Sequence, residues 1–142
     1  MGKRILVPVD GSDQARAAVE FAFEEFPDGE VLLLHVINPA EAGYGAQSSL
    51  PTFPEEWYQQ ETDTAEELFA EIRELAPDPS TIVQTEAVVG RPAGAIVAYA
   101  DEHDVDQIVM GSHGRSGVSR ILLGSVAESV VRKASVPVTV TR

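Results

Sequence analysis

The chain contains no cysteine and only two lysines among its 142 residues. The lack of cysteine excludes disulfides, thiolate metal sites, iron–sulfur clusters and cysteine nucleophiles. No stretch approaches the roughly 18 consecutive apolar residues that are needed to span a bilayer. The first apolar segment is too short for a signal peptide and is not followed by a cleavage site of small residues. We therefore expect a cytoplasmic protein that does not engage a membrane.

Positive charge is also scarce, because 23 acidic residues face 10 basic ones and give a net charge of −13. Such a surface repels nucleic acid, so we expect no DNA or RNA partner. The composition suits an ordinary acidic protein, or one adapted to a salty cytoplasm, where glutamate-rich and lysine-poor surfaces stay hydrated. We favour the halophilic interpretation, which the dependence of the melting temperature on KCl can test.

Short apolar runs alternate with segments of helical spacing, which predicts an α/β fold. We expect strands at residues 5–9, 31–37, 82–89, 107–110 and 136–140. Helices are expected after Ser12, over the apolar positions 65–76, from Pro92 to about Glu102, and from Ser125 to about Ala134. Helical crossovers imply parallel strands, and their right-handedness places helices on both faces of one open sheet. We see one domain, residues 1–142.

Residues 38–54 are rich in glycine, proline, serine and alanine, and they are predicted to form a long loop. Phe53, Trp57 and Tyr58 follow this loop or end it. They could close over a pocket or a partner, but we expect them to seat the second helix on the core. His35 is expected to pack near the end of the second strand.

Glycines follow the fourth predicted strand, at Gly111 and Gly114, and another precedes the last helix, at Gly124. The glycines let backbone N–H groups approach an anion closely, and a helix N-terminus favours phosphate. Ser125 and Glu128 fit a capping box at that helix start. The residues alone leave two interpretations open: an anion site, or glycines that merely turn the chain and a serine that merely caps a helix.

The residues predicted to face the sheet from the last helix are Val126, Val130 and Val131. In an open α/β sheet, ligands bind at the carboxyl ends of the strands. Asp10 and Gly111 both follow predicted strands, so a ligand at this edge would find a carboxylate and a glycine turn.

The full spacing, Gly111-x-x-Gly114, nine residues, then Gly124-Ser125, resembles the nucleotide signature of the universal stress protein family. The resemblance extends to ILVPVDGS at 5–12, LLHVINP at 33–39, VVGRPAGAIVAYA at 88–100, DQIVMGSHGRSG at 106–117 and SVPVTV at 135–140. It implies a five-stranded parallel sheet with strand order 3-2-1-4-5, and it places the chain with the members that bind ATP.

The resemblance also implies a role for each matching residue. Residues expected at the base and ribose are Pro8, Val9, Asp10, Val36, Gly90, Met110 and Gly111. Residues expected at the phosphates are Gly114, Arg115, Gly124, Ser125 and Val126. The resemblance further implies Mg²⁺ or Mn²⁺ held mainly through the phosphates, and a homodimer formed through strand 136–140.

The sequence is compatible with three functions. The favoured one is an ATP-binding regulator of the stress response, acting on a protein partner that the sequence does not identify. A weak ATPase or phosphotransferase is the first alternative, but Asp10 is the one convincing carboxylate at the strand ends. A flavin-binding electron-transfer module is the second, and the glycine segments hold no aromatic residue to stack on a flavin. No lysine lies near these glycines, so this is not the G-x-x-x-x-G-K-S/T loop.

Overall fold

The computed structural model describes residues 2–44, 53–112 and 123–142. In chain order the elements are β1 (Arg4–Pro8), α1 (Asp13–Glu25), β2 (Glu30–Ile37), the 3-10 helix η1 (Pro39–Ala42), α2 (Glu55–Arg73), the 3-10 helix η2 (Pro79–Thr81), β3 (Ile82–Val89), α3 (Pro92–Glu102), β4 (Gln107–Gly111), α4 (Ser125–Lys133) and β5 (Val138–Thr141). Each predicted strand and helix is present, and β5 begins two residues later than predicted. No helix in these ranges is long and apolar enough to cross a membrane.

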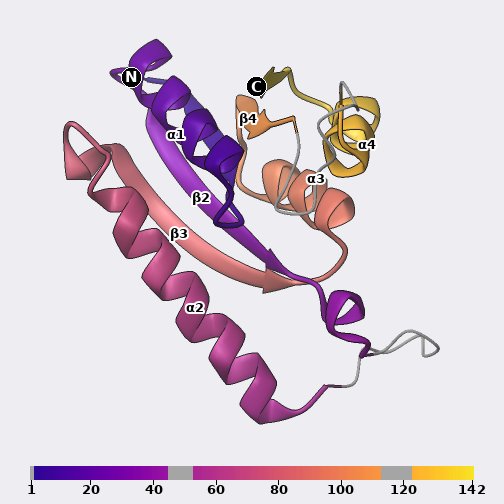
Figure 1. The fold of residues 1–142 in the computed structure, drawn as a ribbon. Coiled ribbons are helices and arrows are strands. Elements are labelled where there is room, and N and C mark those ends of the chain that lie inside the picture. The colour runs from indigo at the N-terminus through magenta and orange to yellow at the C-terminus, as the bar shows by residue number, and fades with distance from the viewer. Residues whose placement is uncertain (1, 45–52, 113–122) are drawn as a thin grey trace.

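The strands form one parallel sheet in the order β3-β2-β1-β4-β5, which confirms the expected fold class (Figure 1). The central strand β1 pairs with β2 on one side and with β4 on the other, so that Leu6 is in register with both Leu32 and Ile108. Ile5, Leu6 and Val7 have no exposed surface. This continuous apolar run is what a strand covered on both faces requires.

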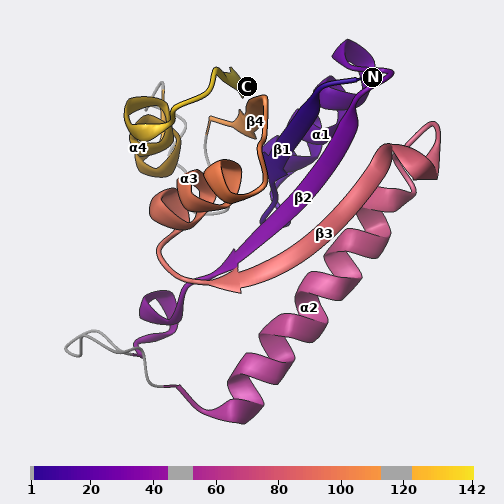
Figure 2. The same cartoon turned by 180° about the vertical axis from the view of Figure 1, so that it is seen from behind.

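Helices cover both faces of the sheet, as the turned view shows (Figure 2). Helices α1 and α2 pack on one face, where Ile5 and Val7 join the buried cluster with Phe69. Helices α3 and α4 pack on the other, where Leu6 and Ile108 lie in a second cluster. Because side chains alternate along a strand, neighbouring residues of β1 supply both cores.

The start of α1 follows the prediction from its sequence. Ser12 is the N-cap residue, and its hydroxyl oxygen accepts a hydrogen bond of 3.0 Å from the amide of Ala15. The buried side chains of the helix are Ala15, Ala18, Val19, Ala22 and Phe23. A cap of this kind stabilises a helix by about 1 kcal/mol.

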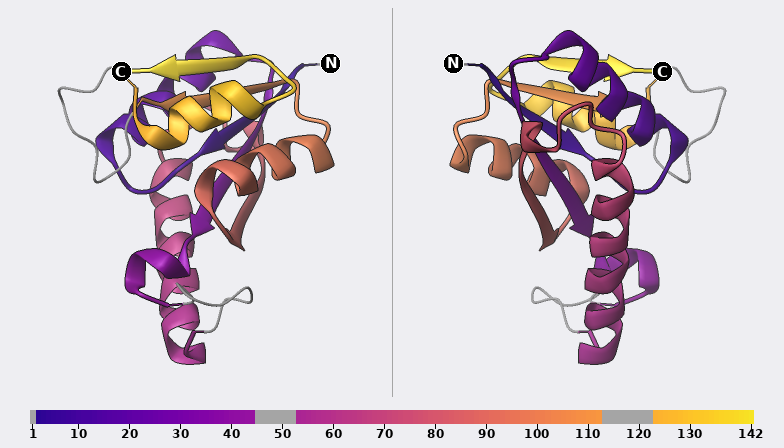
Figure 3. Two further views of the ribbon diagram at one scale, coloured as in Figure 1. Left: turned by 90° about the vertical axis from the view of Figure 1, so that its right-hand side faces the viewer. Right: turned by 90° about the vertical axis from the view of Figure 1, so that its left-hand side faces the viewer.

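Helix α2 starts earlier than its apolar pattern indicates, and only its second half is buried, through Ala65, Phe69 and Ile72. Its first half projects past the end of the sheet together with η1 (Figure 3). There the Trp57 ring packs edge-on against Tyr44 and Phe53, with centroids 5.2 and 5.5 Å apart. The expectation that these aromatics seat α2 on the core is therefore wrong, since they pack on one another outside both buried clusters.

The last helix departs from its prediction in one respect. Val130 is fully buried and Val126 packs at the edge of the core, as expected, but Val131 is 48% exposed. Ala127 takes the inward position instead, with 2% exposure. At about 100° per residue, the inward arc runs from position 126 through 130 to 127, and position 131 lies about 40° beyond 127, on the solvent side of that arc.

Candidate functional site

Strands β1 and β4 are neighbours in the sheet, and the helices that follow them lie on opposite faces. This is the switch point of an open α/β sheet, and in such sheets ligands bind there, outside the carboxyl ends of the strands. Asp10 follows β1 and Gly111 ends β4, so the topology brings these two predicted residues to the same edge.

Asp10 is built into the turn between β1 and α1. Its Oδ1 accepts a hydrogen bond of 3.0 Å from the amide of Ser12, and Gly11 between them has a φ of 84°. A side chain with a Cβ disfavours that φ, so glycine is the natural residue for this turn. The Asp10 carboxylate is therefore positioned at the start of α1 by a local turn that its own side chain stabilises.

The end of β1 is held on its other side by β2. The amide of Val9 donates to the carbonyl of Leu34, and its carbonyl accepts from Nδ1 of His35, both at 2.8 Å. A carbonyl can only accept, so Nδ1 of His35 carries a proton. His35 is 8% exposed, as expected for a residue near the sheet end, but its bond to Val9 is a contact that the sequence does not reveal.

Gly111 has a structural role that differs from the one predicted. A Cβ at this position would lie 3.0 Å from the backbone and Cβ atoms of Gln14 in α1. Contacts that short force a neighbour to move. Glycine thus lets α1 pack closely on β4, and a direct contact of Gly111 with a ligand stays a prediction.

The two predicted anion-binding elements are joined through Ser112. Its carbonyl accepts a hydrogen bond of 2.7 Å from the amide of Gly124, and its own amide donates to Thr141 at 2.8 Å. Ser112 is only 2% exposed. The bond between Gly124 and Ser112 therefore holds the start of α4 beside the end of β4. Gly114 and Arg115 lie outside the described residues.

The start of α4 is capped differently from the prediction. Gly124, not Ser125, is the N-cap residue, and in the described part of the chain no side chain caps this end. Glu128 instead bonds Arg132 one turn further on. The capping box is wrong because Ser125 already lies in the first turn, where its side chain cannot cap its own helix. The first amides of a helix lack partners within it, and the helix dipole favours an anion beside them.

The remaining predicted residues flank this edge in different ways. The amide of Gly90, just after β3, donates to Ile37 at 3.0 Å, and a Cβ there would meet only Ala95, at 3.6 Å. Val36 is partly buried against the core that α3 and α4 cover. Pro8 is partly exposed at the end of β1. Met110 is 5% exposed, so its thioether lies mainly within the core.

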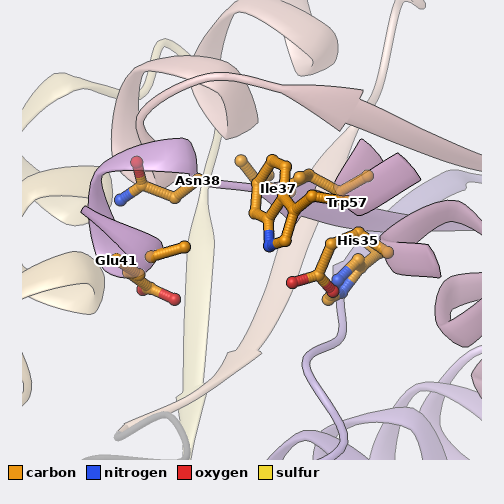
Figure 4. A pocket seen from close by; sticks show the side chains of 8 residues that line it. His35, Ile37, Asn38, Glu41 and Trp57 are labelled. Carbon is orange, nitrogen blue, oxygen red and sulfur yellow. The ribbon is translucent and has the colours of Figure 1, made fainter. Parts of the chain in front are cut away.

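A cavity of about 210 Å³ opens beside this edge, between the end of β2, η1 and the projecting half of α2 (Figure 4). Its lining residues are His35, Val36, Ile37, Asn38, Glu41, Ala42, Trp57 and Glu61. Sequence reasoning placed only Val36 in a site. Trp57, which follows the long loop, is the residue in the sequence that could have indicated this cavity. The expectation given for it is core packing.

Comparison with known proteins identifies the family. The profile of the universal stress protein family matches residues 1–142. Universal stress protein MJ0577 of Methanocaldococcus jannaschii is 36% identical, over 100% of this chain and 96% of the relative. The solved MJ0577 structure superposes with a TM-score of 0.84 and 35% identity, covering 98% of this chain and 94% of that one. The chain belongs to the universal stress protein family.

Two similar solved structures are complexes with adenine nucleotides. The universal stress protein from Archaeoglobus fulgidus in complex with dAMP has 27% identity and a TM-score of 0.67, covering 99% of this chain and 98% of that chain. Another universal stress protein, in complex with cAMP, has 25% identity and a TM-score of 0.63, covering 99% and 97% of the two chains.

Proposed function

We propose that this protein binds ATP at the carboxyl edge of β1 and β4, and that it acts as a nucleotide-dependent regulator of the stress response. The observation that carries the proposal is the start of α4, where no described side chain caps the helix and the Gly124 amide anchors the segment after β4 to Ser112. A phosphate beside Ser125 would meet the first amides of the helix and its positive dipole end.

The base would lie further along the same edge. Asp10 and Val36 come from adjacent strands there, and the space around the Cα of Gly90 can take a ligand atom. The adenine nucleotides held by two relatives support this assignment. Mg²⁺ or Mn²⁺ would be held mainly through the phosphates and water, so that few protein ligands are required.

The contacts of Asp10 favour a regulatory role over ATP hydrolysis. Its Oδ1 already accepts the Ser12 amide at 3.0 Å, which ties the carboxylate to the turn before α1. A catalytic base must instead be positioned to orient water or to accept its proton. The proposal includes the homodimer and the cytoplasmic location expected from the sequence. The regulated partner would bind the protein according to whether a nucleotide occupies the site beside the segment between Ser112 and Gly124.

Isothermal titration of the purified protein with ATP, ADP, AMP and cAMP, with and without Mg²⁺, tests the binding function. Phosphate release in the same samples tests turnover. We expect ATP to bind saturably. We expect phosphate to be released no faster than in buffer without the protein. Release that scales with protein concentration and vanishes in a non-binding variant would instead establish the ATPase.

The variant Ser125→Glu separates phosphate binding from folding. A carboxylate in the first turn of α4 suits the helix dipole, so stability should hold or rise, while the new charge repels phosphate. ATP affinity should fall by about tenfold or more, since one charge contact is worth about 1.4 kcal/mol here. Thr64→Glu, with the same charge change at an exposed site on α2, is the matched control and should leave the affinity unchanged.

A further inference from the structure

We propose that the cavity between β2, η1 and α2 binds a small organic cation, a primary ammonium or guanidinium compound. The cavity holds two carboxylates, one indole ring and one buried imidazole, and none of the described residues that line it is a lysine or an arginine. Among the described residues expected at the nucleotide, Val36 alone lines it. The inference therefore concerns a second ligand and stands whether or not ATP binds at the neighbouring edge.

Neither carboxylate has a counter-ion among the residues that the structure describes. Glu41 lies on η1 and Glu61 on α2, and neither forms an ion pair or a side-chain hydrogen bond with any residue of the described ranges. They face a shared space of about 210 Å³ from two different elements. Two carboxylates that converge without a cation between them repel each other, and a bound cation removes that repulsion.

The ring of Trp57 supplies the aromatic wall. Figure 4 shows it between Glu41 and His35, and the rings of Tyr44 and Phe53 hold it at centroid distances of 5.2 and 5.5 Å. An indole held in place by other aromatics loses little side-chain entropy when a ligand binds. A cation over an indole face is attracted by the ring quadrupole, most strongly where water is excluded.

His35 adds a directed polar group to the lining of the cavity. Its side chain is more than nine-tenths buried, and Nδ1 is occupied by the carbonyl of Val9 at 2.8 Å. No described residue bonds its Nε2. In the neutral ring Nε2 is an acceptor, so it suits an N–H donor of the ligand. The hydrogen bond of Nδ1 thus links the imidazole to Val9, the residue that immediately precedes Asp10.

The chemistry of the lining selects the class of ligand. Glu41 and Glu61 repel phosphate and carboxylate groups, so an anion is disfavoured. Within the described residues no group of three histidine, aspartate or glutamate side chains is arranged to hold a metal ion. An ammonium or guanidinium group instead matches the carboxylates, and the attached carbon chain matches Trp57, Val36 and Ile37. The cavity is smaller than the roughly 300 Å³ of typical drug-sized sites, which limits the ligand to a few heavy atoms.

Trp57 is the sole tryptophan of the chain, so its fluorescence reports directly on this cavity. The test titrates the full-length protein with n-butylammonium chloride and with methylguanidinium chloride at constant ionic strength, and follows the emission. A saturable change is expected for both cations. The neutral probes n-butanol and methylurea, of nearly the same shape, should give no saturable change. Ligand-observed NMR with the same four probes is the second readout, for a bound cation that leaves the emission unaltered.

Two isosteric variants identify the groups responsible. Glu61→Gln and Glu41→Gln should each weaken the binding of the cations about fivefold, as expected for the loss of one partly exposed charge. Glu66→Gln, on the exposed face of the same helix, changes the net charge equally and should leave the affinity as it is. Circular dichroism melting of each variant checks that the fold is retained.

The proposal is overturned by any of three results. Neutral and charged probes could bind alike, the Glu61 and Glu66 variants could weaken binding equally, or neither readout could show saturable binding of a cation. Competition by KCl at matched ionic strength against NaCl would reassign the cavity to potassium ion, and would overturn the organic ligand as well. Unaltered ATP affinity in Glu61→Gln would show that the two sites are separate, so that failure of one leaves the other standing.

Discussion

The amide of Gly124 donates a hydrogen bond of 2.7 Å to the carbonyl of Ser112, across the two ends of the segment that follows β4. This bond fixes the first turn of α4 against the end of the sheet. It also places the start of the helix at the carboxyl edge of the sheet, where Asp10 follows β1. The bond thus sets the geometry of the proposed phosphate site without using the side chain of either residue.

The change Gly124→Pro tests this bond. Gly124 has a φ of −68°, which proline adopts, so the substitution removes the N–H without straining the backbone. Loss of a hydrogen bond to a buried residue should lower the free energy of unfolding by about 1–2 kcal/mol. ATP affinity should fall as well, because the helix start is no longer anchored. Urea unfolding and calorimetric titration measure the two effects.

Gly124→Ala is the matched control, since it keeps the N–H and fits the same φ. It should unfold at a urea concentration closer to that of the parent protein than the proline variant does, and any ATP affinity that it loses is the effect of the Cβ alone. If the alanine and proline variants behave alike, the side chain space at position 124 matters and the hydrogen bond does not.

Gly111→Ala should destabilise the protein through the contact between α1 and β4. The new Cβ would lie 3.0 Å from the carbonyl carbon and oxygen of Gln14, and a helix backbone cannot move away without displacing the core beneath it. We expect a loss of about 1–3 kcal/mol, the range for overpacking. Gly90→Ala, whose Cβ would meet Ala95 at an ordinary 3.6 Å, should unfold at nearly the parent urea concentration.

The same pair of variants separates packing from binding. If Gly90 lies against the base, Gly90→Ala weakens ATP binding while leaving stability intact. Equal losses of stability in the two variants would show that the close approach of Gln14 is not what selects glycine at position 111.

Much of this fold could be predicted because its signals are local. The apolar run around Leu6 and the cap at Ser12 each specify an element from a few adjacent residues, and both are confirmed. The alternation of strand and helix then restricts the sheet to parallel pairing. The strand order was supplied by the resemblance to a family, since periodicity does not say which strands are neighbours.

The features that the sequence could not predict depend on distant residues. Trp57 is expected to seat α2 on the core, but α2 extends past the end of the sheet, and its buried residues begin only at Ala65. The requirement for glycine at position 111 depends on Gln14, far away in the sequence. Likewise, the bond from His35 to Val9 joins two strands, and no local pattern encodes it.

Tyr99 predicts a dependence of stability on alkaline pH. Its ring is 3% exposed and stacks on His103, and burial, followed by the negative charge of Glu86, raises its pKa to about 12. The unfolded chain has the ordinary pKa of about 10. The contribution of Tyr99 to stability is therefore complete below pH 10 and is lost as the pH rises toward 12.

The measurement compares unfolding free energies of the parent protein and Tyr99→Phe between pH 8 and 12. The difference between them should stay constant up to about pH 10 and then shift in favour of phenylalanine. Absorbance at 295 nm should show one late tyrosine ionisation that the variant lacks. A constant difference across the whole range would mean that Tyr99 ionises equally in both states.

The exposed edge of β5 predicts how a homodimer would be disrupted. The carbonyls of Pro137 and Thr141 accept bonds from β4, so the alternate residues Val138 and Val140 direct their backbone groups to the open edge. Val140→Pro removes an outward N–H without taking a bond from β4. If copies pair through this strand, sedimentation should show a monomer.

Val140→Ala is the control for the loss of side-chain packing, because Val140 also contacts the core beneath α4. It retains the outward N–H and should remain a dimer. A Val140→Pro variant that folds and still sediments as a dimer would place the interface elsewhere on the molecule.

The net charge of −13 predicts that both stability and ATP binding tolerate high salt. Repulsion among the acidic residues opposes folding, and it also opposes the approach of a polyanion. At about 1 M salt the Debye length is only about 3 Å, so both repulsions are screened, while short contacts between helix amides and phosphate persist. We expect the melting temperature to rise from low to multimolar KCl, and the affinity for ATP to rise or hold. A protein that is most stable at low salt would contradict the adaptation, whereas a steep fall in ATP affinity with KCl would show that long-range attraction, not the start of α4, holds the nucleotide.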